Sequence, residues 1–141
     1  LEKNTTFCYE DSDWLGDTSY LTSPEYYQQL IQSQIALIST HKDSINALYS
    51  HDLPKEIQFP IAFQNWRFNI MVPKRNELLE KIFKAGLFAS AHYTSVTYLF
   101  CQAKARCAEK NNAYTLNLFN DLRFDINKAK RTVAVIKEHL I

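Results

Sequence analysis

The chain has 141 residues and a formal net charge of +1, with 46% hydrophobic and 22% charged residues, values typical of one globular domain with a sizeable core. This near-neutral charge predicts neither a nucleic-acid nor a membrane partner, and no apolar run approaches the roughly 20 residues that cross a bilayer. Because the whole chain contains 2 glycines, a glycine-rich phosphate-binding loop is excluded.

The cysteines lack the spacing of a metal site. Cys8, Cys101 and Cys107 form no C-x-x-C pair, and the 4 histidines are scattered, so we predict no zinc site. Unpaired thiols are typical of the reducing cytosol, and we therefore expect a cytoplasmic protein. Because the sequence starts at Leu1 rather than at methionine, we also expect a fragment or a processed product.

Residues 1–22 are acidic and aromatic without a steady hydrophobic period, which predicts an extended arm before a single α+β domain at 23–141. Four of its acidic residues cluster around Tyr9 and Trp14; they are Glu10, Asp11, Asp13 and Asp17. Two interpretations remain open: a docking arm for another domain or subunit, or a solvated leader whose rings pack on the body.

A long helix is predicted from Pro24 to about Tyr49. Ser23 is a favourable N-cap, and proline followed by an acidic residue suits the first helical turn. The apolar stripe is narrow and interrupted by polar positions, so we expect part of the helix to pack on a partner. A histidine on such a stripe is more often a hydrogen-bonded structural residue than a ligand. The stripe consists of Tyr27, Ile31, Gln34, Ile38, His41, Ile45 and Leu48.

The sequence pattern in the middle of the chain predicts a strand, a helix and a second strand in succession. An internal proline limits Ile57–Phe63 to an edge strand or an extended lead-in. Alternation of apolar and polar residues predicts a strand at Phe68–Val72, and Asn76 is the expected N-cap of the following helix. Gly86 is placed to end that helix in the left-handed conformation. The apolar stretch Leu87–Tyr93 should return to the sheet.

The next segments carry mixed signals. Residues 95–104 fit either a strand or a helix, and Ala103–Lys110 favours a helix that ends at Asn111. Alternation in Tyr114–Phe119 predicts a short strand. A turn should follow at residues 120–121, where asparagine and aspartate are favoured.

A final helix is predicted after Asp125, a good N-cap. Its expected buried stripe is Ile126, Ala129, Val133, Ile136 and Leu140, and its expected solvated charges are Lys128, Lys130, Arg131 and Lys137. Together the elements predict an α+β fold in which helices cover a small sheet and a long helix stands at the N-terminus.

Several short motifs occur in an order that resembles one enzyme family. They are W-R-F at 66–68, K-A-G at 84–86, L-F-A-S-A-H-Y at 87–93 and L-N-L-F-N-D at 116–121, followed by the closing amphipathic helix. In this order they resemble the C-terminal small domain of the DegT/DnrJ/StrS-type sugar-nucleotide aminotransferases. The resemblance spans Ile35 to Leu140 and implies a pyridoxal-phosphate-dependent parent of fold type I with a mainly antiparallel sheet in its small domain.

The resemblance also implies a function for the parent protein. Such a parent moves an amino group from an amino acid to a keto sugar nucleotide, in amino-sugar or cell-surface polysaccharide biosynthesis. In that family the cofactor lysine, its acidic partner and the phosphate-binding loop lie in a large N-terminal domain outside this sequence. We therefore expect this chain not to bind pyridoxal phosphate or to catalyse alone. Its expected partners are the missing domain and a second copy, which would pair through the long helix.

The residues expected to touch substrate follow from the same resemblance. His92 and Tyr93 are expected to face the active site, where an imidazole and a phenol suit hydrogen bonds to a sugar or diphosphate; alternatively both simply end a strand. Arg123 is a further candidate, whereas Asn120 and Asp121 fit a turn better. We predict no catalytic residue and no metal ligand. The alternative function is a catalytically silent docking module with an exposed aromatic surface, because the aromatic content is 13%.

Overall fold

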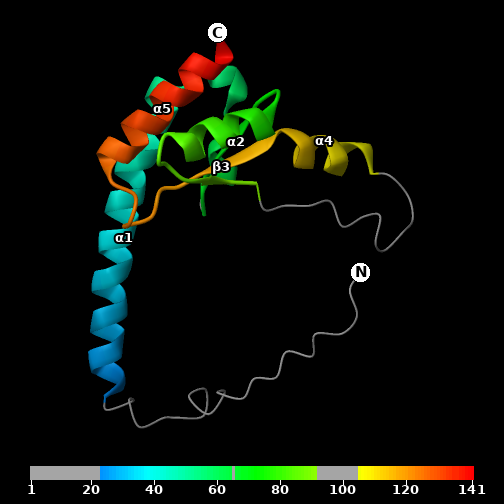
Figure 1. The fold of residues 1–141 in the computed structure, drawn as a ribbon. Coiled ribbons are helices and arrows are strands. Elements are labelled where there is room, and N and C mark those ends of the chain that lie inside the picture. Colours follow the sequence, from blue (N-terminus) through cyan, green and yellow to red (C-terminus); the bar gives the residue numbers. More distant parts are fainter. Residues whose placement is uncertain (1–22, 65, 92–104) are drawn as a thin grey trace, which may run out of the picture. The chain divides into compact units, whose positions relative to one another are not determined.

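The computed structural model describes residues 23–64, 66–91 and 105–141. In these ranges the chain forms an α+β fold of four α-helices and a three-stranded antiparallel sheet (Figure 1). By its internal contacts the chain divides into Leu1–Ala36 and Leu37–Ile141, and the sheet and its core belong to the second unit. None of the described helices is both long and apolar enough to cross a membrane.

Helix α1 runs from Pro24 to Asp52, slightly beyond its predicted end. The predicted N-cap is confirmed, because the Ser23 hydroxyl oxygen accepts a hydrogen bond from the amide of Tyr26 at 3.3 Å. The helix ends shortly before Pro54, since a residue that precedes proline avoids the helical conformation. Only the last part of α1 contributes to the core, through Ile45 and Tyr49.

Strand β3, Thr115–Leu118, is the centre of the sheet. It pairs antiparallel with β1, Phe68–Met71, and with β2, Ala89–Ser90. In this register Phe68 lies opposite Leu118, so side chains of both strands meet on the core face. The antiparallel sheet that the family resemblance implied is confirmed.

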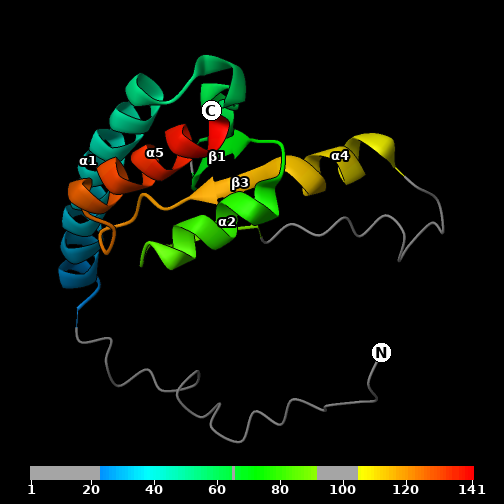
Figure 2. The same ribbon diagram turned by 45° about the horizontal axis from the view of Figure 1, so that its top comes forward.

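Two helices cover the core face of the sheet. Helix α2, Arg75–Lys84, contacts β2, β3 and the C-terminal helix α5, Ile126–Leu140 (Figure 2). The predicted stripe of α5 is confirmed in its middle, where Ala129, Val133 and Ile136 are buried. Its two ends are corrected: Ile126 and Leu140 are exposed because they lie beyond the part of the helix that packs on the sheet.

Helix α2 begins earlier than predicted. Its N-cap is Lys74, in the left-handed conformation at φ 52°, and Asn76 instead lies inside the first turn. The reason is local: the Asn76 side chain accepts a hydrogen bond from Nε of Arg75 rather than from a helix amide. The predicted helix end is confirmed, since Gly86 has φ 69° and the amide of Leu87 reaches back into the last turn, to the carbonyl oxygen of Ile82 at 3.0 Å.

Three further predictions need correction. Helix α4, Arg106–Tyr114, runs past the asparagines that were expected to end it, so β3 starts at Thr115. The segment before β1 forms two 3₁₀ turns, Lys55–Ile57 and Ile61–Phe63, and only Gln58 between them bridges to β1. The strand predicted at Leu87–Tyr93 is reduced, within the described residues, to Ala89–Ser90. Tertiary pairing decided these boundaries, which local propensity leaves open by a few residues.

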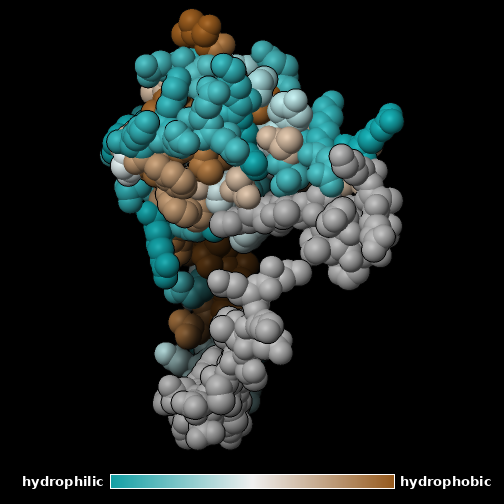
Figure 3. All heavy atoms as spheres, turned by 45° about the vertical axis from the view of Figure 1, so that its right-hand side comes forward, coloured by the Kyte–Doolittle hydropathy of each residue, from teal (hydrophilic) through white to brown (hydrophobic). Residues whose placement is uncertain are grey.

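The described surface carries groups of large apolar side chains on α1 and around the connection from α2 to β2, and a third group before β1, namely Ile61, Phe63 and Trp66. In the space-filling view they appear between hydrophilic residues (Figure 3). The first group lies on the N-terminal half of α1 and includes Ile31 and Ile35. The second group, Phe83 and Phe88, lies around the connection from α2 to β2.

Candidate functional site

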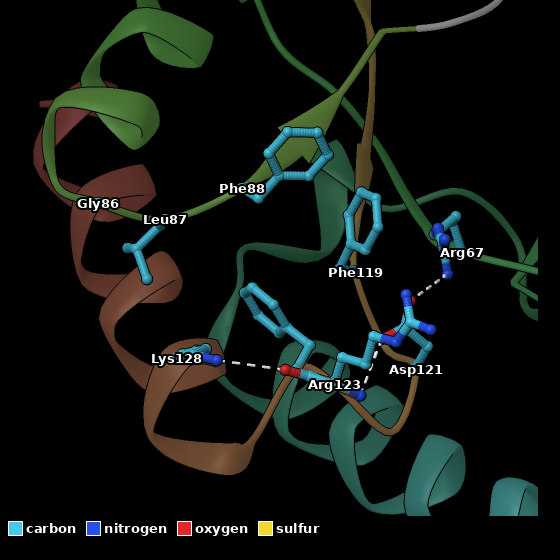
Figure 4. Close-up of a pocket in the computed structure, with 9 residues that line it drawn as sticks. Arg67, Gly86, Leu87, Phe88, Phe119, Asp121, Arg123 and Lys128 are labelled. Atoms are coloured by element: carbon cyan, nitrogen blue, oxygen red, sulfur yellow. Dashed lines mark hydrogen bonds and ion pairs between the residues drawn. The ribbon is translucent and has the colours of Figure 1, made fainter.

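An open pocket of about 510 Å³ lies beside the edge of the core in the second unit (Figure 4). Three connections and one helix build it: the approach to β1, the loop from α2 to β2, the loop from β3 to α5, and the first turn of α5. Its lining combines phenylalanine rings with cationic side chains. The lining residues are Arg67, Gly86, Leu87, Phe88, Phe119, Asp121, Arg123, Phe124 and Lys128.

Arg67 is the least exposed cation of the pocket. Its guanidinium carbon lies 3.9 Å from the centroid of the Phe119 ring and 4.8 Å from that of Trp66, both within the range of cation–π attraction. Its Nη1 atom lies 3.3 Å from the Asp121 carboxylate. The side chain is 13% exposed, and its buried Nε atom makes no hydrogen bond within the described chain. Stacking and the ion pair thus hold the charge in one place.

Three phenylalanine rings, Phe88, Phe119 and Phe124, form the apolar wall of the pocket, and Phe83 extends their row beyond it. The rings of Phe83 and Phe88 lie 5.6 Å apart, those of Phe88 and Phe119 lie 4.9 Å apart at 80°, and Phe124 follows at 6.3 Å from Phe119. Edge-to-face rings at these distances attract one another beyond simple burial. Because Phe88 remains 50% exposed, this wall can still accept another ring.

The loop from β3 to α5 places Arg123 at the rim. The Asp121 carboxylate accepts a hydrogen bond from the amide of Arg123 at 3.0 Å, and the carbonyl of Asp121 accepts one from the amide of Phe124. This is the turn predicted at Asp121. Lys128 donates to the carbonyl oxygen of Arg123 at 3.2 Å, and its Nζ lies 3.8 Å from the Asp125 carboxylate.

His41 holds this turn from the side of α1. Its Nε2 atom lies 3.0 Å from the carbonyl oxygen of Asp121 and 3.1 Å from that of Phe124. Both partners only accept hydrogen bonds, so Nε2 must carry the hydrogen. The structural interpretation of His41 is therefore confirmed.

The structure brings only part of the predicted site together. Arg123 lines the pocket, whereas His92 and Tyr93 lie outside the described residues. Asn120 is fully buried, and its amide nitrogen donates to the side-chain oxygen of Asn46 at 2.8 Å, so it anchors the loop to α1. The solvated position predicted for Lys128 is confirmed, since the residue is exposed, and its ammonium group also donates to the loop.

Arg67, Phe88 and Phe119 were missed as site residues. Each of the three residues lies in or beside a predicted strand. No local pattern indicates that these three segments of the sequence contact one another in the fold. One signal was present: an arginine between Trp66 and Phe68 has aromatic neighbours on which a guanidinium can stack.

The pocket is suited to binding a ligand that carries both an anionic group and a ring. Three cationic side chains and one carboxylate line it, so it favours an anionic group beside an aromatic ring. Its lining contains no pair of groups arranged as nucleophile and base. Within the described ranges no three His, Cys, Asp or Glu side chains gather where they could hold a metal ion.

The long helix, the small antiparallel sheet and the covering helices form an aminotransferase small-domain-like fold. The solved structure of S. venezuelae DesV in complex with a ketimine intermediate matches this chain with a TM-score of 0.64 at 15% sequence identity. The match covers 79% of this chain and 34% of the DesV chain, so the likeness concerns the fold of about a third of DesV. No protein-family model and no curated protein sequence matches the chain.

Proposed function

We propose that this chain is the small domain of a pyridoxal-phosphate-dependent aminotransferase of the DegT/DnrJ/StrS type, acting on a keto sugar nucleotide. The observation that carries the proposal is the fold shared with DesV over 79% of this chain. The ketimine bound to DesV is the kind of carbon–nitrogen double bond that transamination passes through. Because the match takes up 34% of DesV, we expect the parent protein to contain a further, larger domain.

The described residues do not fit the cofactor on their own. A lysine that reacts with the aldehyde of pyridoxal phosphate is typically held in a desolvated pocket. None of the lysines in the described ranges is buried. We therefore assign the cofactor lysine and the acidic partner of the pyridine nitrogen to the rest of the parent. The contribution proposed for this chain is contact with the substrate through His92, Tyr93 and Arg123.

The isolated chain is expected to bind no pyridoxal phosphate. After mixing and dialysis, its absorption spectrum should show no band near roughly 410–430 nm, the region of a lysine-bound cofactor. The full-length parent is the matched control: it should keep the band and transfer the amino group of glutamate to a keto sugar nucleotide. A band on the isolated chain that resists dialysis would contradict the cofactor assignment. A parent without transaminase activity would contradict the proposed function.

A docking module remains the second candidate, and α1 favours it. From Tyr26 to Thr40 the helix contains no charged residue. Its apolar side chains there are exposed, with Ile31 at 55% and Ile35 at 58%. An exposed, uncharged helix face of this length is typical of an interface. Under either function we propose that a second copy of the chain covers it, because Tyr27, Ile31, Gln34 and Ile38 follow the spacing of a two-stranded helical seam.

Self-association through α1 is expected to depend on the helix face formed by Tyr27, Ile31, Gln34 and Ile38. Sedimentation equilibrium over a hundredfold concentration range should show a homodimer, whose interface would bury on the order of 1,200 Å² or more. The double variant Ile31→Lys/Ile38→Lys should weaken the dimer by at least about tenfold, because it places charges in an apolar contact. Gln29→Lys/Ala36→Lys is the matched control, with the same charges and the same seven-residue spacing on the opposite side of the helix. A wild-type monomer at every concentration, or equal weakening by both variants, would rule out this interface.

A further inference from the structure

Charge is distributed unevenly along the chain. Residues 1–22 contain five acidic residues and one lysine, a net charge of −4, and residues 23–141 therefore carry +5 of the total of +1. The first segment is also rich in aromatic residues, namely Phe7, Tyr9, Trp14 and Tyr20. It is thus an anionic aromatic peptide attached to a cationic body.

The pocket beside Phe88 offers the complementary chemistry. The carboxylate of Asp121 neutralises Arg67, which leaves Arg123 and Lys128 as the cations of the rim. Arg123 is exposed, and Lys128 keeps 46% of its side chain exposed although Asp125 lies nearby. Both cations line the same pocket as the phenylalanine rings of the apolar wall, so one ligand can contact a ring and pair with a cation at the same time (Figure 4).

The rings and carboxylates of the arm lie close together in the sequence. Asp11 and Asp13 lie between Tyr9 and Trp14, with Asp17 three residues further on. An indole or phenol ring suits an edge-to-face contact with the exposed Phe88, while a neighbouring carboxylate suits the guanidinium of Arg123. Uncharged apolar peptides lack the second of these interactions, and charged peptides without rings lack the first.

We propose that the segment Tyr9–Asp17 of one copy binds the Phe88 pocket of a second copy. Every copy carries both the segment and the pocket, so two copies can exchange arms reciprocally. Such an exchange is a closed two-fold arrangement with two identical contacts. This interaction is independent of the aminotransferase proposal, because it requires neither cofactor nor substrate.

Charge exchange between two variants of the full chain tests the proposal. The arm variant is Glu10→Lys/Asp11→Lys/Asp13→Lys, which changes the net charge of Tyr9–Asp17 from −4 to +2. The pocket variant is Arg123→Glu/Lys128→Glu. Each alone should associate at least about tenfold more weakly than wild type, because like charges then face each other. An equimolar mixture should restore association, since the cationic arm then meets the anionic pocket and the anionic arm meets the cationic pocket. Fluorescence-detected sedimentation of one variant, labelled at its C-terminus, measures this directly.

The controls separate this contact from a general effect of charge and from misfolding. Lys130→Glu/Lys137→Glu makes the same charge change on α5 outside the pocket and should leave association unchanged. Circular dichroism confirms that each variant is folded. If the pocket variant fails to fold, Phe88→Ala takes its place. Phe88→Ala should weaken association, and mixing it with the arm variant should not restore association. Three results would overturn the proposal: a monomeric wild type, equal association of all variants, or a mixture no stronger than its components.

Discussion

Replacing Ile136 with alanine is expected to lower the free energy of unfolding by about 2–5 kcal/mol. Ile136 is 0% exposed and belongs to the core cluster that the sheet forms with α1, α2 and α5. The substitution removes buried methyl groups and leaves a cavity that packed neighbours fill only in part. This makes it one of the two largest effects expected for a single substitution.

Lys130→Ala on the same helix is the matched control. Lys130 is exposed, so its loss should change the free energy of unfolding by no more than about 0.5 kcal/mol. Urea unfolding followed by circular dichroism compares the two variants with wild type. A larger effect for Lys130 than for Ile136 would mean that the faces of α5 are assigned wrongly.

The other large effect concerns the alkaline limit of stability and depends on Tyr49. Tyr49 is 0% exposed, and its hydroxyl donates a hydrogen bond to the carbonyl oxygen of Phe119 at 3.0 Å. Burial raises the pKa of Tyr49 well above its ordinary value of 10.0, because the ionised phenol is disfavoured away from water. The folded chain therefore keeps the proton at a pH where the unfolded chain releases it.

This pKa difference sets the direction of the pH dependence. Below about pH 10 both states are protonated, and Tyr49→Phe should cost about 1 kcal/mol through the lost hydrogen bond. Above that pH, ionisation of the unfolded state destabilises wild type by up to about 1.4 kcal/mol per pH unit. The phenylalanine variant lacks this loss, so it should become relatively more stable as the pH rises. Urea unfolding at about pH 8 and about pH 11 tests the change; a difference between the two proteins that is the same at both values would contradict it.

Local patterns predicted most of the secondary structure. Period-two alternation located β1 and β3, the Ser23 and Asp125 caps marked two helix starts, and Gly86 marked a helix end. These signals act between neighbouring residues, so no tertiary information was needed. The error at Asn76 is also local, whereas the end of α4 was decided by the pairing of β3 with β1.

The pocket could be predicted only in fragments. Arg123 was a candidate, and the turn at Asp121 was expected, but the ring wall and Arg67 come from segments about fifty residues apart in the sequence. Hydrogen bonds from His41 and Asn120 join α1 to this loop across 80 and 74 residues of sequence. No pattern among neighbouring residues predicts that these distant segments contact one another.

The sequence by itself determined the fold class and the chief helices and strands, because hydrophobic period, capping and turn chemistry act over a few residues. The tertiary structure alone decided which cations and rings share a pocket. That choice depends on the β1-β3-β2 strand order, which brings Arg67, Phe88 and Phe119 together from three strands or their flanks. Packing of helices on the sheet selects that order from the alternatives, and the selection is a property of the whole core rather than of any one segment.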